Sequence, residues 1–136
     1  MTEGRSSDRG AAGSVTILPV PFNDRALVDR FIRVPFRIHA GDPTWVPPLM
    51  MERRDSLSPR KNPLFSHCEA QLFLAVRDGR DVGRISAQVD SLSPLTAQSI
   101  GYFGMICAED DGAVIAALFD AAESWLRDRG MTGILG

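Results

Sequence analysis

The sequence QLFLAVRDGRDVGRISAQV, residues 71–89, decides the fold class of this chain. Its two apolar halves show the period of two that is typical of β-strands. The Asp78-Gly79 pair between them is typical of a tight hairpin turn. We therefore predict an antiparallel hairpin, with strands over 71–77 and 82–89 joined by that turn.

The residues after the hairpin predict a strand, a helix and a further strand. The run 100–108 is rich in β-forming residues and contains two glycines, which indicate a bulge or a close approach to the backbone. Asp110 or Asp111 can cap a helix with an apolar stripe, and Gly130 is placed to stop it. The run 131–136 then predicts a strand parallel to the one before the helix, because a helical crossover connects the two.

The residues before the hairpin predict one strand and two helices. Residues 1–14 are polar and rich in Gly, Ser and Arg, so we expect a disordered tail. A strand over 15–20 follows, then a helix that Pro35 must bend or end, and a short helix over 49–56. This order predicts one domain, residues 15–136, of the α+β (mixed α/β) class, in which helices cover the faces of a sheet.

The last predicted strand stops at Gly136 with no turn and no polar tail. A natural domain rarely ends on an unfinished apolar strand, so we expect the coding region to be truncated at its C-terminal end. An exposed strand at a sheet edge also leaves amides and carbonyls unpaired, so we expect self-association through it.

Composition excludes several classes of function. The formal net charge is −2, so no basic field exists to hold nucleic acid or an anionic membrane. Cys68 and Cys107 lie far apart, and with two histidines they form no metal-ligand pattern. The start of the chain lacks the apolar stretch of a secretory signal. We expect a cytoplasmic protein with no metal, no nucleic acid and no membrane partner.

Short motifs follow one another along the chain. They are residues 36–38 and 41–49 (FRI and GDPTWVPPL), 61–67 (KNPLFSH), 72–75 (LFLA), 82–85 (VGRI), 101–104 (GYFG) and 121–126 (AAESWL). In this order they resemble a group of longer bacterial proteins of the GNAT (N-acetyltransferase-like) type. The resemblance implies a GNAT-like acyl-CoA N-acyltransferase fold, present here as its N-terminal portion up to the fifth strand.

The resemblance also implies transfer of an acetyl group from acetyl-CoA to a small-molecule or peptide amine. In this fold the fourth and fifth strands part, and the pantetheine arm lies between them. The helix after the fourth strand receives the pyrophosphate on its N-terminus. The corresponding positions here are Met105, Ile106, Cys107, Gly112 and Ala113. A helix N-terminus suits phosphate because its free amides and partial positive charge face the anion.

One loop departs from the family pattern. Residues 109–111 are Glu109-Asp110-Asp111, where the family has small residues with an Arg or Gln. Three carboxylates at a helix start oppose a pyrophosphate unless they point away or hold a cation, and their simpler role is to cap the helix. An alternative therefore stays open, in which the domain is degenerate and non-catalytic and serves as a structural or partner-binding module.

The candidate catalytic residues are few. His67 is a candidate base because histidine titrates near neutrality, although a turn hydrogen bond is its structural alternative. Glu69 is a candidate base if it is buried, and Tyr102 is a candidate general acid late in the transfer. We expect Arg84 to form a salt bridge with Glu69 or Asp90.

Overall fold

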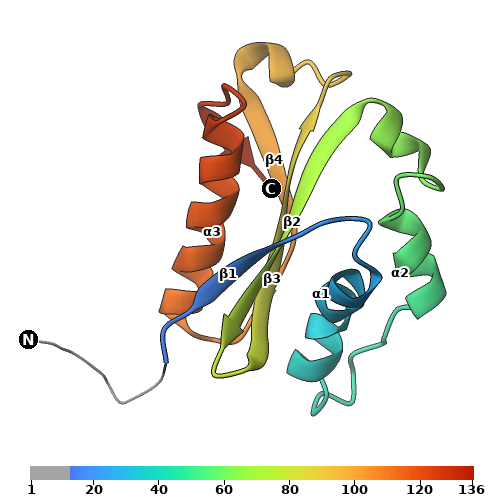
Figure 1. Ribbon diagram of the computed structural model, residues 1–136, viewed down its shortest axis with the longest axis vertical. Helices are drawn as coiled ribbons and strands as arrows, with labels where there is room; N and C mark the ends of the chain where they lie inside the picture. Colours follow the sequence, from blue (N-terminus) through green and yellow to red (C-terminus); the bar gives the residue numbers. More distant parts are fainter. Residues whose placement is uncertain (1–12) are drawn as a thin grey trace, which may run out of the picture.

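The computed structural model describes residues 13–136, so the tail predicted over 1–14 lies almost wholly outside the described residues. At its centre is a five-stranded sheet with the strand order β1-β2-β3-β4-β5 (Figure 1). The strands are β1 (Thr16–Val20), β2 (Cys68–Arg77), β3 (Arg80–Asp90), β4 (Ile100–Ala108) and β5 (Gly133–Leu135). Neighbouring strands are antiparallel from β1 to β4, whereas β5 runs parallel to β4, as predicted.

The predicted hairpin is confirmed and is longer than predicted. β2 pairs with β3 along its whole length, from Cys68 opposite Asp90 to Arg77 opposite Arg80. Between the strands, the φ angles of Asp78-Gly79 are 52° and 73°. A type I′ turn requires left-handed backbone at both central residues, which Asp tolerates and Gly adopts without steric cost.

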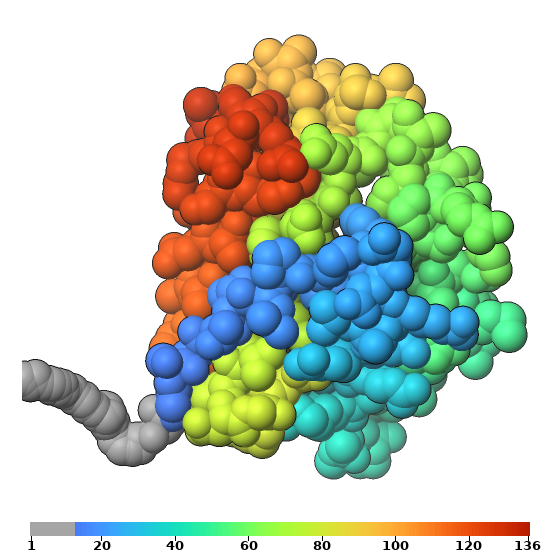
Figure 2. Space-filling model, in the orientation of Figure 1, coloured from blue at the N-terminus to red at the C-terminus, as the bar shows by residue number. Residues whose placement is uncertain are grey.

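Three α-helices cover the two faces of the sheet. α3 (Gly112–Arg127) lies on one face, and α1 (Arg25–Ile38) and α2 (Met50–Ser56) lie on the other (Figure 1). In the space-filling view, β1 crosses between the α3 flank and the α1 flank (Figure 2). This arrangement confirms the predicted α+β class. None of the helices in the described part of the chain is long and apolar enough to cross a membrane.

The sheet separates two apolar clusters. The buried residues between α3 and the sheet are Phe73, Ala75, Val82, Ile85, Ala87, Val114, Leu118, Ala122 and Leu126. Those on the α1 side are Val20, Val28, Phe31, Ile32, Val34, Leu57, Leu72 and Leu74. A Cβ added at Gly101 would lie 2.5 Å from Leu126 Cδ2. The predicted close approach to a β4 glycine is therefore confirmed at Gly101.

Helix α1 does not end at Pro35 but runs on to Ile38. Proline has no N–H group, so the carbonyl of Phe31, four residues earlier, cannot accept its usual hydrogen bond within the helix. The proline therefore leaves a buried carbonyl in α1 that a group from outside the helix must satisfy.

Candidate active site

Strand β4 bulges where its pairing with β3 changes register. Ser86 of β3 pairs with Gly104, and Arg84 pairs with Cys107, so β4 has one residue more than β3 across this interval. Met105 within the bulge has a φ of 54°. This left-handed conformation costs a residue with a side chain about 1–3 kcal/mol and persists only where the surroundings hold it.

Beyond its start, β4 has an open edge. β5 pairs with β4 only from Ile100 to Tyr102. From Phe103 to Ala108, no strand in residues 13–136 lies on that edge. Such an edge presents unpaired N–H and C=O groups to an extended ligand.

A groove of about 240 Å³ lies next to the bulge on the α1–α2 face of the sheet. Most of its lining side chains are apolar, and Gly104 and Met105 connect it to the bulge. The lining residues are Phe22, Arg53, Ser56, Leu57, Asn62, Leu64, Phe65, Cys68, Ala70, Leu72, Ser86, Gln88, Gly104 and Met105. A groove of this composition favours a ligand with an apolar chain.

The titratable side chains of the groove lining are Arg53 and Cys68. Burial raises the pKa of the Cys68 thiol, and the nearby carboxylates of Asp90 and Glu69 raise it further. The thiol therefore stays protonated near neutral pH. The lining also contains no carboxylate and no histidine, so the groove itself supplies no ordinary general base.

Arg84 lies beside the bulge, and its expected salt bridge to Glu69 or Asp90 is wrong. Its Nε donates to the carbonyl of Met105 (3.0 Å), and its Nη1 donates to the carbonyl of Phe31 (3.1 Å). The residue is only 8% exposed. Burial lowers the pKa of Arg84 to about 10, so the guanidinium is still charged at neutral pH.

The three catalytic candidates gather at the end of the sheet away from the hairpin turn, and none of them lines the groove. The side chain of Glu69 is 61% exposed and forms an ion pair with Arg129 (2.9 Å). It is therefore not the buried base that the sequence argument required. The hydroxyl of Tyr102 shares a hydrogen bond with Ser93 Oγ (2.7 Å).

His67, the third candidate, is paired with a carboxylate. Its Nδ1 lies 2.8 Å from Asp90 Oδ1, which also accepts the amide of Leu92 at 2.9 Å. The Leu92 amide and the His67 ring hold the pKa of Asp90 below its usual range. A histidine that donates from Nδ1 to a carboxylate keeps Nε2 available to accept a proton.

The expected cofactor positions form one segment that runs from the bulge to the start of α3. Met105, Ile106 and Cys107 belong to the bulged part of β4, and Gly112 and Ala113 are the first two residues of α3. The amide of Ala113 already donates to the carboxylate of Asp111, the N-cap residue of α3 (2.9 Å). A phosphate can use this amide only by displacing that carboxylate.

The acidic loop does not present its charge unopposed. Glu109 accepts hydrogen bonds from Arg37 (2.6 Å) and Arg80 (3.2 Å), and Asp111 accepts one from Arg77. These arginines hold the pKa values of Glu109 and Asp111 below their usual range. The loop thus has three carboxylates, and three neighbouring arginines balance their charge.

Sequence reasoning missed the groove and the role of Arg84. The rings of the groove residues Phe22 and Phe65 meet edge-on, with centroids 5.0 Å apart. Phe22 comes from a turn and Phe65 from a short 3₁₀-helix (Pro63–Ser66), and neither segment is long enough to show a periodic pattern. For Arg84 a signal was present, because a charged residue inside an apolar strand and a proline inside a helix each imply an unusual partner.

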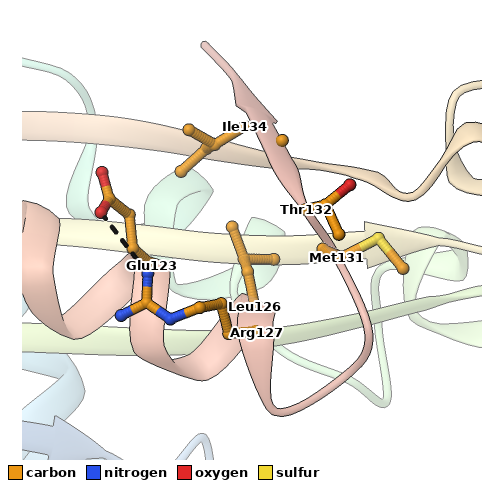
Figure 3. A pocket seen from close by; sticks show the side chains of 7 residues that line it. Glu123, Leu126, Arg127, Met131, Thr132 and Ile134 are labelled. Carbon is orange, nitrogen blue, oxygen red and sulfur yellow. Dashed lines mark ion pairs between the residues drawn. The ribbon is translucent and has the colours of Figure 1, made fainter.

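A second hollow, of about 410 Å³, lies between the C-terminal end of α3 and β5 (Figure 3). Its charged residues, Glu123 and Arg127, both come from α3 and pair with each other at 3.8 Å. The rest of its lining includes Leu126, Met131 and Ile134. It lies away from the bulge and its charges are already matched, so the groove beside β4 is the stronger candidate.

Comparison with known sequences finds relatives but no matching family model. The chain is 56% identical over 119 residues to the bacterial ceramide synthase of Caulobacter vibrioides. The aligned residues make up 86% of this chain and 31% of that protein. It is 46% identical over 107 residues to protein YghO of Escherichia coli, and this alignment covers 78% of this chain and 27% of that protein. The chain therefore spans about a third or less of the length of these relatives.

Solved structures share the fold. The chain resembles a tandem GNAT protein from the clavulanic acid biosynthesis pathway (TM-score 0.63, 16% identity), covering 85% of this chain and 34% of that one. It also resembles a predicted acetyltransferase with acetyl-CoA from Clostridium acetobutylicum (TM-score 0.59, 12% identity, 89% and 79% covered). A third neighbour is an aminoglycoside acetyltransferase from a soil metagenomic sample, in complex with sisomicin (TM-score 0.59, 14% identity, 89% and 75% covered). From its strand order and these neighbours, the chain has the GNAT N-acetyltransferase-like fold that the sequence resemblance predicted.

Proposed function

We propose that this chain forms the acyl-CoA site of an N-acyltransferase whose amine acceptor carries an apolar chain. The observation that supports this most strongly is the position of an apolar groove next to the bulge of β4. The donor would lie along the open edge of β4, and the acceptor would enter through the groove. The two substrates would then meet at Met105.

The open edge from Phe103 to Ala108 suits the pantetheine arm of acyl-CoA. The arm is extended and contains amide groups, so it can pair with strand N–H and C=O groups as another strand would. The diphosphate would lie near the start of α3, where Arg77 and Arg80 are now bonded to carboxylates. A diphosphate can replace those carboxylates, since it offers the same kind of charged acceptor. Acetyl-CoA is the simplest donor, and a longer acyl-CoA uses the same contacts.

The groove supports an apolar acceptor over a polar one. Phe65, Leu72 and Met105 are among its lining residues, and the lining contains no carboxylate to bind a polycationic amine. The relative from C. vibrioides carries the name ceramide synthase, and a ceramide is an N-acylated long-chain amino alcohol. Both observations favour a long-chain amine with a small polar head.

The chemistry is direct acyl transfer. The neutral amine attacks the thioester carbonyl, a C–N bond forms, the C–S bond breaks, and the departing thiolate takes up a proton. We propose that His67 Nε2, with its Nδ1 bonded to Asp90, accepts the amine proton through intervening water. Tyr102 is the proposed proton donor to the thiolate, and Glu69 is less suited because it is exposed and paired.

A transfer assay on a protein of the relatives' length tests this proposal. It would be incubated with acetyl-CoA or palmitoyl-CoA and with either a long-chain amino alcohol or a polar aminoglycoside, and the amide product would be measured by mass spectrometry. We expect the long-chain amide to form, and we expect the polar amine to remain unmodified. Binding of acyl-CoA without any amide product would support the non-catalytic alternative instead.

Two matched variants test the groove itself. Ala70→Phe places an aromatic ring in the groove, whereas Ala116→Phe adds the same ring at an exposed position of α3 on the opposite face of the sheet. We expect Ala70→Phe to lower kcat/KM for the long-chain amine about tenfold or more, since the pocket loses volume that the substrate uses. Equal activity of the two variants would contradict the assignment of the groove.

A further inference from the structure

Two backbone carbonyls, far apart in the sequence, bond to one buried guanidinium. The first is the carbonyl of Phe31 in α1, which has no partner in the helix because residue 35 is proline. Nη1 of Arg84 fills this gap at 3.1 Å, in a buried position. The guanidinium also lies over the Phe31 ring, 5.0 Å from its centre.

The second carbonyl belongs to the bulge of β4. Nε of Arg84 donates to the carbonyl of Met105 at 3.0 Å. Met105 is the bulge residue with the left-handed φ of 54°, a conformation that its side chain disfavours. A charged donor on the carbonyl of that residue helps to hold the peptide in this orientation.

A purely structural role for Arg84 does not explain this arrangement well. No ion pair between described residues involves Arg84, so its buried charge is compensated by carbonyl dipoles and the aromatic ring instead of a carboxylate. Burying a charge in this way is costly. If the only need were the gap in α1, a shorter neutral donor would satisfy one carbonyl at less cost.

We propose that Arg84 is a positioning residue that fixes the bulge of β4 by tying it to the proline gap of α1. It thereby sets the place at which the acyl carbonyl of the donor meets the groove. This inference rests on the proposed function for its catalytic consequence, but the effect on the bulge does not depend on any substrate.

The proline offers a way to separate the two bonds of Arg84. Pro35→Ala restores an N–H that can bond to the Phe31 carbonyl within α1. In the double variant Pro35→Ala with Arg84→Met, the gap in α1 is therefore repaired, whereas the Met105 carbonyl still lacks its donor. A loss that persists in the double variant reports on the bulge and not on the stability of α1.

The experiment measures amide hydrogen exchange and acyl-transfer kinetics on a protein of the relatives' length. In Arg84→Met and in the double variant, we expect those amides of residues 103–107 that face β3 to exchange about tenfold faster or more, because the bulge loses its anchor. Pro35→Ala alone keeps the bond from Arg84 Nε to the Met105 carbonyl, and the Phe31 carbonyl has a second lone pair for Nη1, so we expect this variant to exchange like the wild type. Arg33→Met, an exposed change of the same kind on α1, is the matched control.

For kinetics, we expect the double variant to regain thermal stability relative to Arg84→Met while kcat stays about tenfold or more below the wild type. Arg84→Lys, which can reach one carbonyl, should recover part of kcat. Wild-type exchange and wild-type kcat in the double variant would overturn the inference. If the wild type transfers no acyl group, the proposed function fails, and the exchange data alone still decide whether Arg84 holds the bulge.

Discussion

Replacing Gly83 and Leu118 by alanine, singly and together, tests the packing of α3 on the sheet. Gly83 lies in β3 under α3, and a Cβ built there would lie 2.8 Å from Leu118 Cδ1 and 3.1 Å from Val114 Cγ1. Leu118 itself is fully buried. The two positions therefore compete for the same space, so their effects on stability must be coupled.

The expected magnitudes follow from this contact. Leu118→Ala leaves a cavity and costs about 3 kcal/mol of unfolding free energy. Gly83→Ala overpacks the same region, which costs about 1–3 kcal/mol, and regains less than about 1 kcal/mol by restricting the unfolded chain. In the double variant, the new methyl group occupies part of the cavity and its closest clash, with Leu118, disappears. We expect the double variant to be at least about 1 kcal/mol more stable than the sum of the single changes predicts.

Urea unfolding followed by circular dichroism measures these free energies. The slope of unfolding free energy against urea concentration must stay the same in all variants, so that the comparison concerns the folded contact. Additivity of the two changes within about 0.5 kcal/mol would refute the reasoning, because independent sites add to that accuracy.

The arginine partners of Glu109 hold its folded-state pKa below the unfolded value near 4.5. This carboxylate therefore stabilises the fold above that pH, and the contribution is lost as the pH falls through the folded pKa. Glu109→Gln should make the free energy of unfolding fall less steeply between neutral pH and pH 3. Gly101→Val should strongly lower the melting temperature, because a Cβ at this position would lie 2.5 Å from Leu126 Cδ2. Gly104→Ala should leave the melting temperature nearly unchanged, because the atom nearest to its Cβ is 3.5 Å away. Equal decreases in melting temperature would contradict this packing. Leu135 is 50% exposed and lies on β5, at the sheet edge that we expect to self-associate. Leu135→Lys should therefore lower the molar mass of the assemblies that the 136-residue chain forms, measured by size-exclusion chromatography with light scattering. A monomeric wild-type chain would contradict this prediction.

The parts of the fold that depend on local chemistry were predictable from the sequence. Three such features depend on residues whose conformational preferences are readable along the chain. They are the Asp78-Gly79 turn, an aspartate N-cap for α3, which is Asp111, and a close approach to a glycine of β4, which occurs at Gly101. The predicted ends of the strands and helices differ from the observed ones by only a few residues, because the periodic patterns were clear. The persistence of α1 through Pro35 was not predictable, since it depends on a partner from another element.

The site was less predictable because its contacts join distant segments. Arg84 was expected to find a carboxylate, since nearby acids were the obvious partners, whereas the structure uses it on two backbone carbonyls. The acidic loop was judged on its own charge, and the arginines that neutralise Glu109 come from α1 and from the hairpin. A sequence pattern shows which side chains are charged but not which groups will face them after folding.

Calorimetric titration of acyl-CoA into a protein of the relatives' length tests the central claim most directly. If the open edge of β4 and the start of α3 form the donor site, acetyl-CoA should bind saturably with about one molecule per chain and should raise the melting temperature, as any ligand of the folded state does. The absence of both heat and thermal shift at millimolar acetyl-CoA or palmitoyl-CoA would contradict the account and would leave the GNAT-like domain as a non-catalytic module.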